Sequence, residues 1–224
     1  MATHGKLNVD VFIEPSFQEN GFLLSCEGDE TCWLVDPGLP SLQTTGMIEA
    51  IRERKLKLEK VLLTHGHADH IAGVDILRSE FDGVEVVCPR GEEHMLTDAN
   101  ANLSAPFGFP VTFTPAERIV EVGDELTLAT LNWRILDVAG HSPAGVAYYC
   151  ADADVALVGD SVFAESIGRY DLPGSSREKL LANIRDNILT LPDETFIYSG
   201  HGPAATIGQI KESNRVLRWE LGQQ

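Results

Sequence analysis

Histidine is concentrated in three short segments of this 224-residue chain, and that distribution constrains the fold more than any other feature. Five of the seven histidines lie in Thr64–His70, Gly140–Pro143 and Ser199–Pro203, and Val158–Ser161 adds an aspartate. Together these segments supply five imidazoles and two carboxylates, enough nitrogen and oxygen ligands for two divalent ions. The chain must therefore fold so that distant segments meet at one metal site, which predicts a reaction in which metal-activated water attacks a substrate.

The first segment directly follows a short apolar strand, residues 61–63. His65 and His67 then point to the same side of an extended loop, so both can reach one ion, whereas Asp69 and His70 begin a helix and can face a second. A carboxylate at a helix N-terminus is also favoured by the helix dipole. We expect one ion on His65, His67 and His141, a second on Asp69, His70 and His201, and Asp160 bridging the two. Asp69 is also the expected catalytic residue, because it can orient the attacking water.

Three further residues are candidates for supporting roles. Asp36 either orients a metal ligand or forms the turn before Pro37. Arg169 either binds a substrate carboxylate or forms an ion pair with Asp171. Tyr148 alternates with its neighbour along a strand, so it either contacts the substrate or packs in the core.

The hydrophobic pattern predicts an α+β protein with a single domain over residues 1–224. Short apolar runs between Gly-, Asn- and Asp-containing turns indicate strands, and apolar residues spaced by about one helical turn indicate helices. Strands followed by helices, twice over, favour two β-sheets packed together with helices outside. We expect strands at residues 7–13, 21–26, 31–35, 61–63, 84–88, 119–122, 126–130, 133–138, 146–150, 155–158 and 195–198, and helices at 47–55, 69–80, 177–191 and 207–221.

Residues 92–114 interrupt this pattern with a stretch rich in Asn, Pro, Gly and Phe. The stretch is long for a plain connection, so we expect either a partly ordered lid or a surface excursion without a role.

Charge and composition exclude several classes of function. A net charge of −17 argues against nucleic-acid binding. There is no apolar run long enough to span a bilayer and no apolar signal core near the N-terminus, so we expect a cytoplasmic protein, monomeric or homodimeric, that acts on a small molecule. Cys26 and Cys32 flank a turn and can pair across a hairpin, but free buried thiols are expected in a reducing compartment.

The chain resembles the metallo-β-lactamase superfamily, and within it the small glyoxalase II-like (hydroxyacylglutathione hydrolase-like) thioesterases. The resemblance spans residues 12–219. It includes the His-x-His-x-Asp-His segment, Val35-Asp36-Pro37-Gly38 and Asn102-Leu103-Ser104. It also includes the Gly-Arg-x-Asp stretch at residues 168–171 and the Gly-His-Gly-Pro stretch at 200–203. The resemblance implies a four-layer αββα sandwich with metals at the edge of its two sheets.

The activity implied by the resemblance is hydrolysis of S-acylglutathione-like thioesters by a metal-bridged hydroxide. Two divalent ions are expected, Zn²⁺ first, with Fe or Mn as alternatives. A rival in the same superfamily is a persulfide dioxygenase with one Fe(II) on His65, His141 and Asp160. Hydrolysis of lactones or other esters, and metal binding without turnover, are the remaining alternatives.

Overall fold

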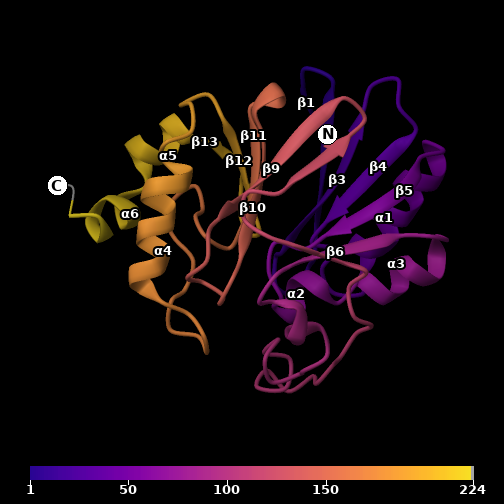
Figure 1. The fold of residues 1–224 in the computed structure, drawn as a ribbon, viewed down its shortest axis with the longest axis horizontal. Helices are drawn as coiled ribbons and strands as arrows, with labels where there is room; N and C mark the ends of the chain where they lie inside the picture. Colours follow the sequence, from indigo (N-terminus) through magenta and orange to yellow (C-terminus); the bar gives the residue numbers. More distant parts are fainter. Residues whose placement is uncertain (223–224) are drawn as a thin grey trace.

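Two β-sheets lie face to face at the centre of the molecule, and helices cover the outer face of each (Figure 1). The computed structural model describes residues 1–222. The first sheet has seven strands in the order β1-β2-β3-β4-β5-β6-β7, and the second has six in the order β13-β12-β11-β10-β9-β8. The predicted αββα sandwich is therefore confirmed.

The strands of the first sheet are antiparallel from β1 to β4 and parallel from β4 to β7. In the second sheet only β11 and β12 are parallel neighbours. The first sheet comprises β1 (Ala2–His4), β2 (Leu7–Ile13), β3 (Asn20–Cys26), β4 (Thr31–Val35), β5 (Lys57–Leu62), β6 (Glu85–Pro89) and β7 (Arg118–Val120). The second comprises β8 (Glu125–Leu128), β9 (Leu131–Asp137), β10 (Val146–Cys150), β11 (Val155–Gly159), β12 (Phe196–Ser199) and β13 (Ala205–Thr206).

The helices lie on the two outer faces, as Figure 1 shows. Beside the first sheet are α1 (Leu42–Glu53), α2 (Ala68–Ile71) and α3 (Val74–Glu80). Beside the second are α4 (Arg177–Asn183), which continues as a π-helical turn over Ile184–Ile188, and then α5 (Ile207–Ser213) and α6 (Arg215–Glu220). Short 3₁₀ turns occur at Glu93–Leu96 and Ala151–Ala153.

Three apolar cores hold these layers together. Between the sheets, Trp33 of β4 and Trp133 of β9 are fully buried with ring centroids 6.4 Å apart. Outside the first sheet, Met47 of α1 packs in a second core, and outside the second sheet Leu180 of α4 packs in a third. A sheet covered on both faces buries both sides of its strands, and all seven residues of β3 are accordingly buried.

Two predicted helices are divided in the structure. The helix predicted at 69–80 is interrupted at Ala72 and Gly73, where a Cβ on Gly73 would contact the backbone oxygen of Pro37. The helix predicted at 207–221 is interrupted at Asn214, whose side chain caps α6 and donates to the Phe163 and Ser166 carbonyls. Tertiary contacts therefore override helical periodicity at both points.

Cys26 and Cys32 do not form the disulfide that a facing hairpin pair would allow. The register pairs Cys32 with Ser25, so Cys26 packs between the sheets and Cys32 packs under the helices of the first sheet. All four cysteines are free and buried. Within residues 1–222, none of the helices combines the length and the apolar character needed to cross a membrane.

Candidate metal centre

The histidine segments meet because each follows the carboxyl end of a strand at the same edge of the sandwich. Thr64–His70 follows β5, Asp160 follows β11 and His201 follows β12. His141 follows β9. Both β9 and β11 are antiparallel to β10, which lies between them, so β9 and β11 run in the same direction. The topology therefore gathers side chains that lie far apart in sequence.

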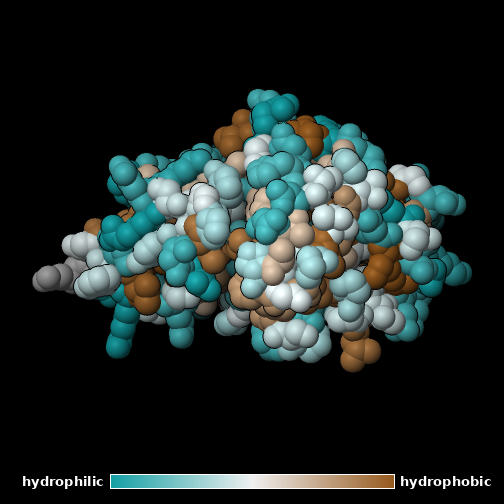
Figure 2. Space-filling view, turned by 90° about the horizontal axis from the view of Figure 1, so that it is seen from below, coloured by the Kyte–Doolittle hydropathy of each residue, from teal (hydrophilic) through white to brown (hydrophobic). Residues whose placement is uncertain are grey.

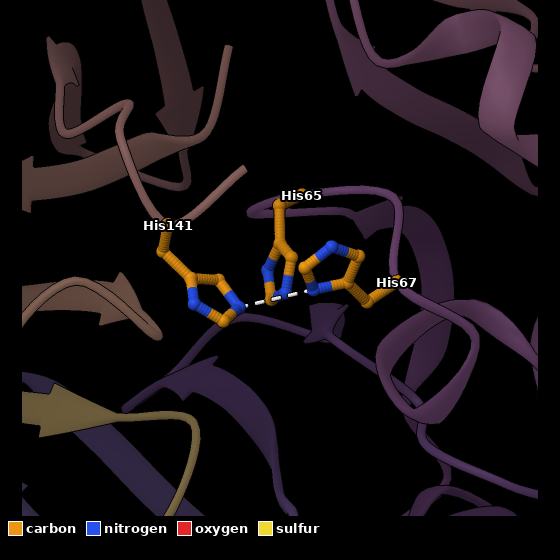
Figure 3. Close-up of side chains that lie close together, drawn as sticks. All are labelled: His65, His67 and His141. Carbon is orange, nitrogen blue, oxygen red and sulfur yellow. Dashed lines mark hydrogen bonds between the residues drawn. The ribbon is translucent and has the colours of Figure 1, made fainter. Parts of the chain in front are cut away.

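His65, His67 and His141 form the first group of potential ligands (Figure 3). One ligand atom from each lies within 4.8 Å of the others, and all three residues are buried. His141 Nε2 lies 3.0 Å from His67 Nδ1, the contact drawn as a dashed line. Two ring nitrogens this close suit a shared cation, because each can direct a lone pair at it.

Asp69, His70 and His201 form the second group, again with ligand atoms within 4.8 Å of one another. Asp160 lies between the groups. Its Oδ2 is 3.6 Å from His141 Nε2 and 3.4 Å from His201 Nε2. Its Oδ1 is 3.5 Å from His70 Nε2. The structure thus brings all seven predicted ligands together, with Asp160 in reach of both groups.

Asp36 orients two of these histidines from behind. It is fully buried, and its Oδ2 lies 3.1 Å from His70 Nδ1. The Thr64 hydroxyl donates to the same oxygen at 2.6 Å and lies 3.0 Å from His65 Nδ1. Because Thr64 donates to Asp36, it accepts from His65, and the Nε2 atom of each histidine is left free to face the site.

The backbone oxygen of Arg169 has the same function for His141. His141 Nδ1 lies 3.0 Å from this carbonyl, so Nδ1 carries the proton and Nε2 faces the site. This contact, and the contribution of Thr64, were not predicted from the sequence. A main-chain acceptor leaves no trace in residue identity.

Burial and the neighbouring charges divide the histidines into two kinds. Burial, with help from His141, lowers the pKa of His67 to about 3, and burial also lowers the pKa of His65. Burial opposes protonation of His201, but hydrogen bonds to Asp160 and Asp69 raise its pKa to about 10. Burial likewise opposes protonation of His70, yet the carboxylates of Asp160 and Asp69 raise its pKa.

Several buried polar atoms of the site have no hydrogen-bond partner. Such atoms show whether the site suits metal ions. Those on the expected ligand atoms are Nε2 of His65, Nε2 of His70 and Oδ1 of Asp160. Buried polar atoms are normally paired, so unpaired imidazole nitrogens and an unpaired carboxylate oxygen among the two ligand groups indicate a ligand. Nitrogen and oxygen donors without thiolate suit Zn²⁺, Fe²⁺ or Mn²⁺. The residues present therefore fit divalent metal ions.

A cleft of about 700 Å³ opens above the metal centre. Its floor includes His67, Asp69, His141, Asp160 and His201. Its walls are mainly apolar and consist of Phe17, Ala68, Leu103, Phe107, Phe109, Phe163, Ala164, Ile167, Leu172 and Pro203, with Asn102, Glu165, Ser166, Arg169 and Gly202 between them.

Residues 92–114 form one wall of this cleft. Asn102 is fully buried, and its amide nitrogen donates to the carbonyls of Met95 and Val111. Its own carbonyl accepts from the N–H of Ala68, beside the metal centre. The segment is therefore tied both to itself and to the ligand loop.

The two candidate substrate residues lie in different places. Arg169 lines the cleft, but its guanidinium makes a two-fold hydrogen bond to Asp171 at 2.9 and 3.0 Å. Tyr148 lies in the core between the sheets, fully buried, and its hydroxyl donates to the Leu63 carbonyl at 2.8 Å. The structure therefore contradicts the substrate role considered for Tyr148 and shows core packing instead, because the inward side of β10 faces the other sheet.

Comparison with known proteins gives a consistent result. Residues 16–201 match the family model described as the metallo-beta-lactamase superfamily. "Probable metallo-hydrolase YqgX" from Bacillus subtilis is 37% identical over 197 residues, which cover 88% of this chain and 90% of that protein. "Hydroxyacylglutathione hydrolase GloC" from Haemophilus influenzae is 33% identical over 213 residues, covering 94% and 98%. The crystal structure of BLEG-1 B3 metallo-beta-lactamase aligns with a TM-score of 0.87 and 34% identity, covering 93% of this chain and 98% of that one.

Proposed function

The chain belongs to the metallo-β-lactamase superfamily, and from this premise we propose that it is a metal-dependent hydrolase of thioesters of the S-acylglutathione type. The relative named hydroxyacylglutathione hydrolase supports this choice of substrate class. The four free, buried cysteines suit a reducing compartment, so we place the reaction in the cytoplasm, on a small-molecule substrate and in a monomer or homodimer.

The position of Asp160 is the observation that carries the proposal. One of its oxygens lies within 3.6 Å of a histidine from each ligand group, at the floor of an apolar cleft. A carboxylate shared in this way suits two ions close together. We therefore assign one ion to His65, His67 and His141, a second to Asp69, His70 and His201, and Asp160 to both.

Ions bound there would lower the pKa of a coordinated water to about 7 and polarise a substrate carbonyl. Asp69 lines the cleft floor, so its carboxylate can accept a hydrogen bond from the attacking water and orient it. The oxygen of water joins the acyl carbon as the carbon–sulfur bond breaks, and the products are a carboxylate, a thiol and one proton. A thiol with a pKa of about 8.5 leaves readily as thiolate, so the site needs no separate acid for it.

Metal analysis combined with a hydrolysis assay tests this function. We expect about two Zn²⁺ ions per chain in protein purified without added metal, together with thioester hydrolysis. Asp160→Ala should lose both metal and activity, whereas the exposed control Asp186→Ala should keep them. Full activity in Asp160→Ala would reject the site as assigned.

The same experiment separates the rival activities. One Fe per chain, with O₂ consumed on a glutathione persulfide, would replace the hydrolase by the dioxygenase that uses His65, His141 and Asp160. Hydrolysis of lactones or oxygen esters without thioester hydrolysis would keep the metal centre and change the substrate class.

A further inference from the structure

Three phenylalanine rings form a cluster in the lining of the cleft. Phe17, from the loop between β2 and β3, contacts Phe107 with ring centroids 6.3 Å apart and Phe109 with centroids 6.0 Å apart. All three rings line the cleft, and none is fully buried; Phe107 remains 57% exposed. Apolar surface gathered beside a reaction centre indicates a binding site for an apolar group.

The scaffold holds this cluster in place before any ligand binds. The N–H of Phe107 donates to the Leu103 carbonyl at 3.2 Å, and that of Phe109 donates to the Ser104 carbonyl at 3.0 Å. Ser104 is itself buried and bonded to Asn102. Figure 2 shows the face seen from below in Figure 1, where white, tan and brown surface gathers near the middle and hydrophilic surface is more abundant towards the ends. Because its backbone is bonded in this way, the apolar wall binds at a lower cost in conformational entropy than a loose loop would.

Away from its floor the cleft offers little to an anionic group, and Glu165 adds a carboxylate to its lining. Among the described residues that line it, Arg169 is the one lysine or arginine, and Asp171 already occupies its guanidinium. Carrier thiols such as glutathione bear a net negative charge. The charged thiol part of a thioester therefore extends towards solvent, and the acyl part is left to cover the rings.

On this basis, and resting on the thioesterase function proposed above, we propose that the cleft selects thioesters with an apolar acyl group, which lies against Phe17, Phe107 and Phe109. The substrate class is alkyl or aryl acyl thioesters rather than short hydroxyacyl ones. Each methylene buried against the rings should raise kcat/KM by about fourfold.

An acyl series on one small neutral thiol tests the proposal in the metal-loaded protein. N-acetylcysteamine thioesters of acetyl, butanoyl, hexanoyl, phenylacetyl and 2-hydroxypropanoyl groups keep the leaving thiol constant. We expect kcat/KM to rise from acetyl to hexanoyl, and the hydroxyacyl compound to react more slowly than the butanoyl one. Rates that are flat or fall along the series would overturn the proposal and leave the hydrolase function standing, whereas no hydrolysis of any member would count against that function.

Substitution locates the selectivity. Phe107→Ala should reduce the hexanoyl-to-acetyl ratio of kcat/KM by about tenfold, since a large side chain is removed from the wall, while Phe107→Leu should retain most of the ratio. Phe196→Ala removes a ring of similar exposure, 39%, that does not line the cleft, and should leave the ratio unchanged. An unchanged ratio in Phe107→Ala, or an equal fall in Phe196→Ala, would remove the cluster from substrate selection.

Discussion

The carboxylate of Glu92 accepts a hydrogen bond of 2.9 Å from the backbone N–H of Gly66, the residue between His65 and His67. Its other oxygen accepts one of 2.7 Å from the N–H of Ala144, in the loop that carries His141. Glu92 is fully buried. One side chain therefore ties together the two loops that supply the first ligand group.

Replacing this carboxylate should loosen the first group. In Glu92→Gln the amide offers one acceptor oxygen, so one backbone N–H loses its partner. We expect the free energy of unfolding of the metal-free protein to fall by about 1–3 kcal/mol, and the first ion to bind more weakly. Chemical denaturation and metal titration measure the two effects. Glu93→Gln, at the partly exposed neighbour, is the control, and equal behaviour of the two variants would contradict the clamp.

Asp36→Asn should weaken metal binding without removing a ligand. One carboxylate oxygen accepts from the Thr64 N–H, and the other accepts from the Thr64 hydroxyl and His70 Nδ1. An amide nitrogen in place of either oxygen would face a donor, so the ligand loop or a histidine loses a hydrogen bond that fixes it. We expect metal affinity to fall by about 10- to 100-fold, measured by competition with a chelator. Asp29→Asn is a matched control, since Asp29 accepts a backbone N–H in a turn away from the site. Wild-type affinity in Asp36→Asn would show that the aspartate only shapes its turn.

The sequence predicted those parts of the molecule that local patterns encode. The ranges expected for β2, β4 and β10 match the structure to the residue, because alternating or continuous apolar runs end there at turn residues. The seven candidate ligands could be named because they sit in short motifs at strand ends. β1 and β13 were missed, since edge strands this short carry too few residues for a pattern.

Contacts that depend on tertiary structure could not be predicted in the same way. The partners of Glu92 are backbone N–H groups of two distant loops, and any residue type supplies such a group. The alternation of Tyr148 and Tyr149 showed that one of them faces inward, but not that the inward side of β10 meets the other sheet. The phenylalanine wall is assembled from two separate loops, so no spacing in the sequence links Phe17 to Phe107 and Phe109.

The two ligand groups should differ in the protons that they release on binding metal. Without metal, His201 has a pKa of about 10 and is protonated at pH 8, and the carboxylates of Asp160 and Asp69 raise the pKa of His70 in the same direction. A proton on the ligand nitrogen competes with the ion, and raising the pH removes it. The affinity of the second group for its metal ion should therefore rise as the pH is raised to about 10. The rise should be up to about tenfold per pH unit for each proton released.

The first group should show no such release from His65 and His67, which are neutral at pH 8 because their pKa values are lowered. Calorimetric titration in two buffers of different ionisation enthalpy gives the number of protons released for each ion. We expect one to two protons for the second group and fewer for the first. Equal release for both ions would contradict the charge states assigned to His70 and His201.

Gly200 should be intolerant of even one methyl group. A Cβ at this position would overlap Asp160 Oδ1 and His70 Cε1, so alanine must displace a residue of the second ligand group or the residue shared by both. Since a displacement of about 1 Å can lower activity about 100-fold, we expect Gly200→Ala to lose at least that much activity and the second ion. Gly46→Ala in α1 is the control, because its Cβ would meet only the Phe12 ring at 3.3 Å and alanine favours the helix. Near-normal metal content in Gly200→Ala would mean that Asp160 and His70 can move without losing their ligand geometry. Close packing around Gly200 would then not be the cause of that geometry.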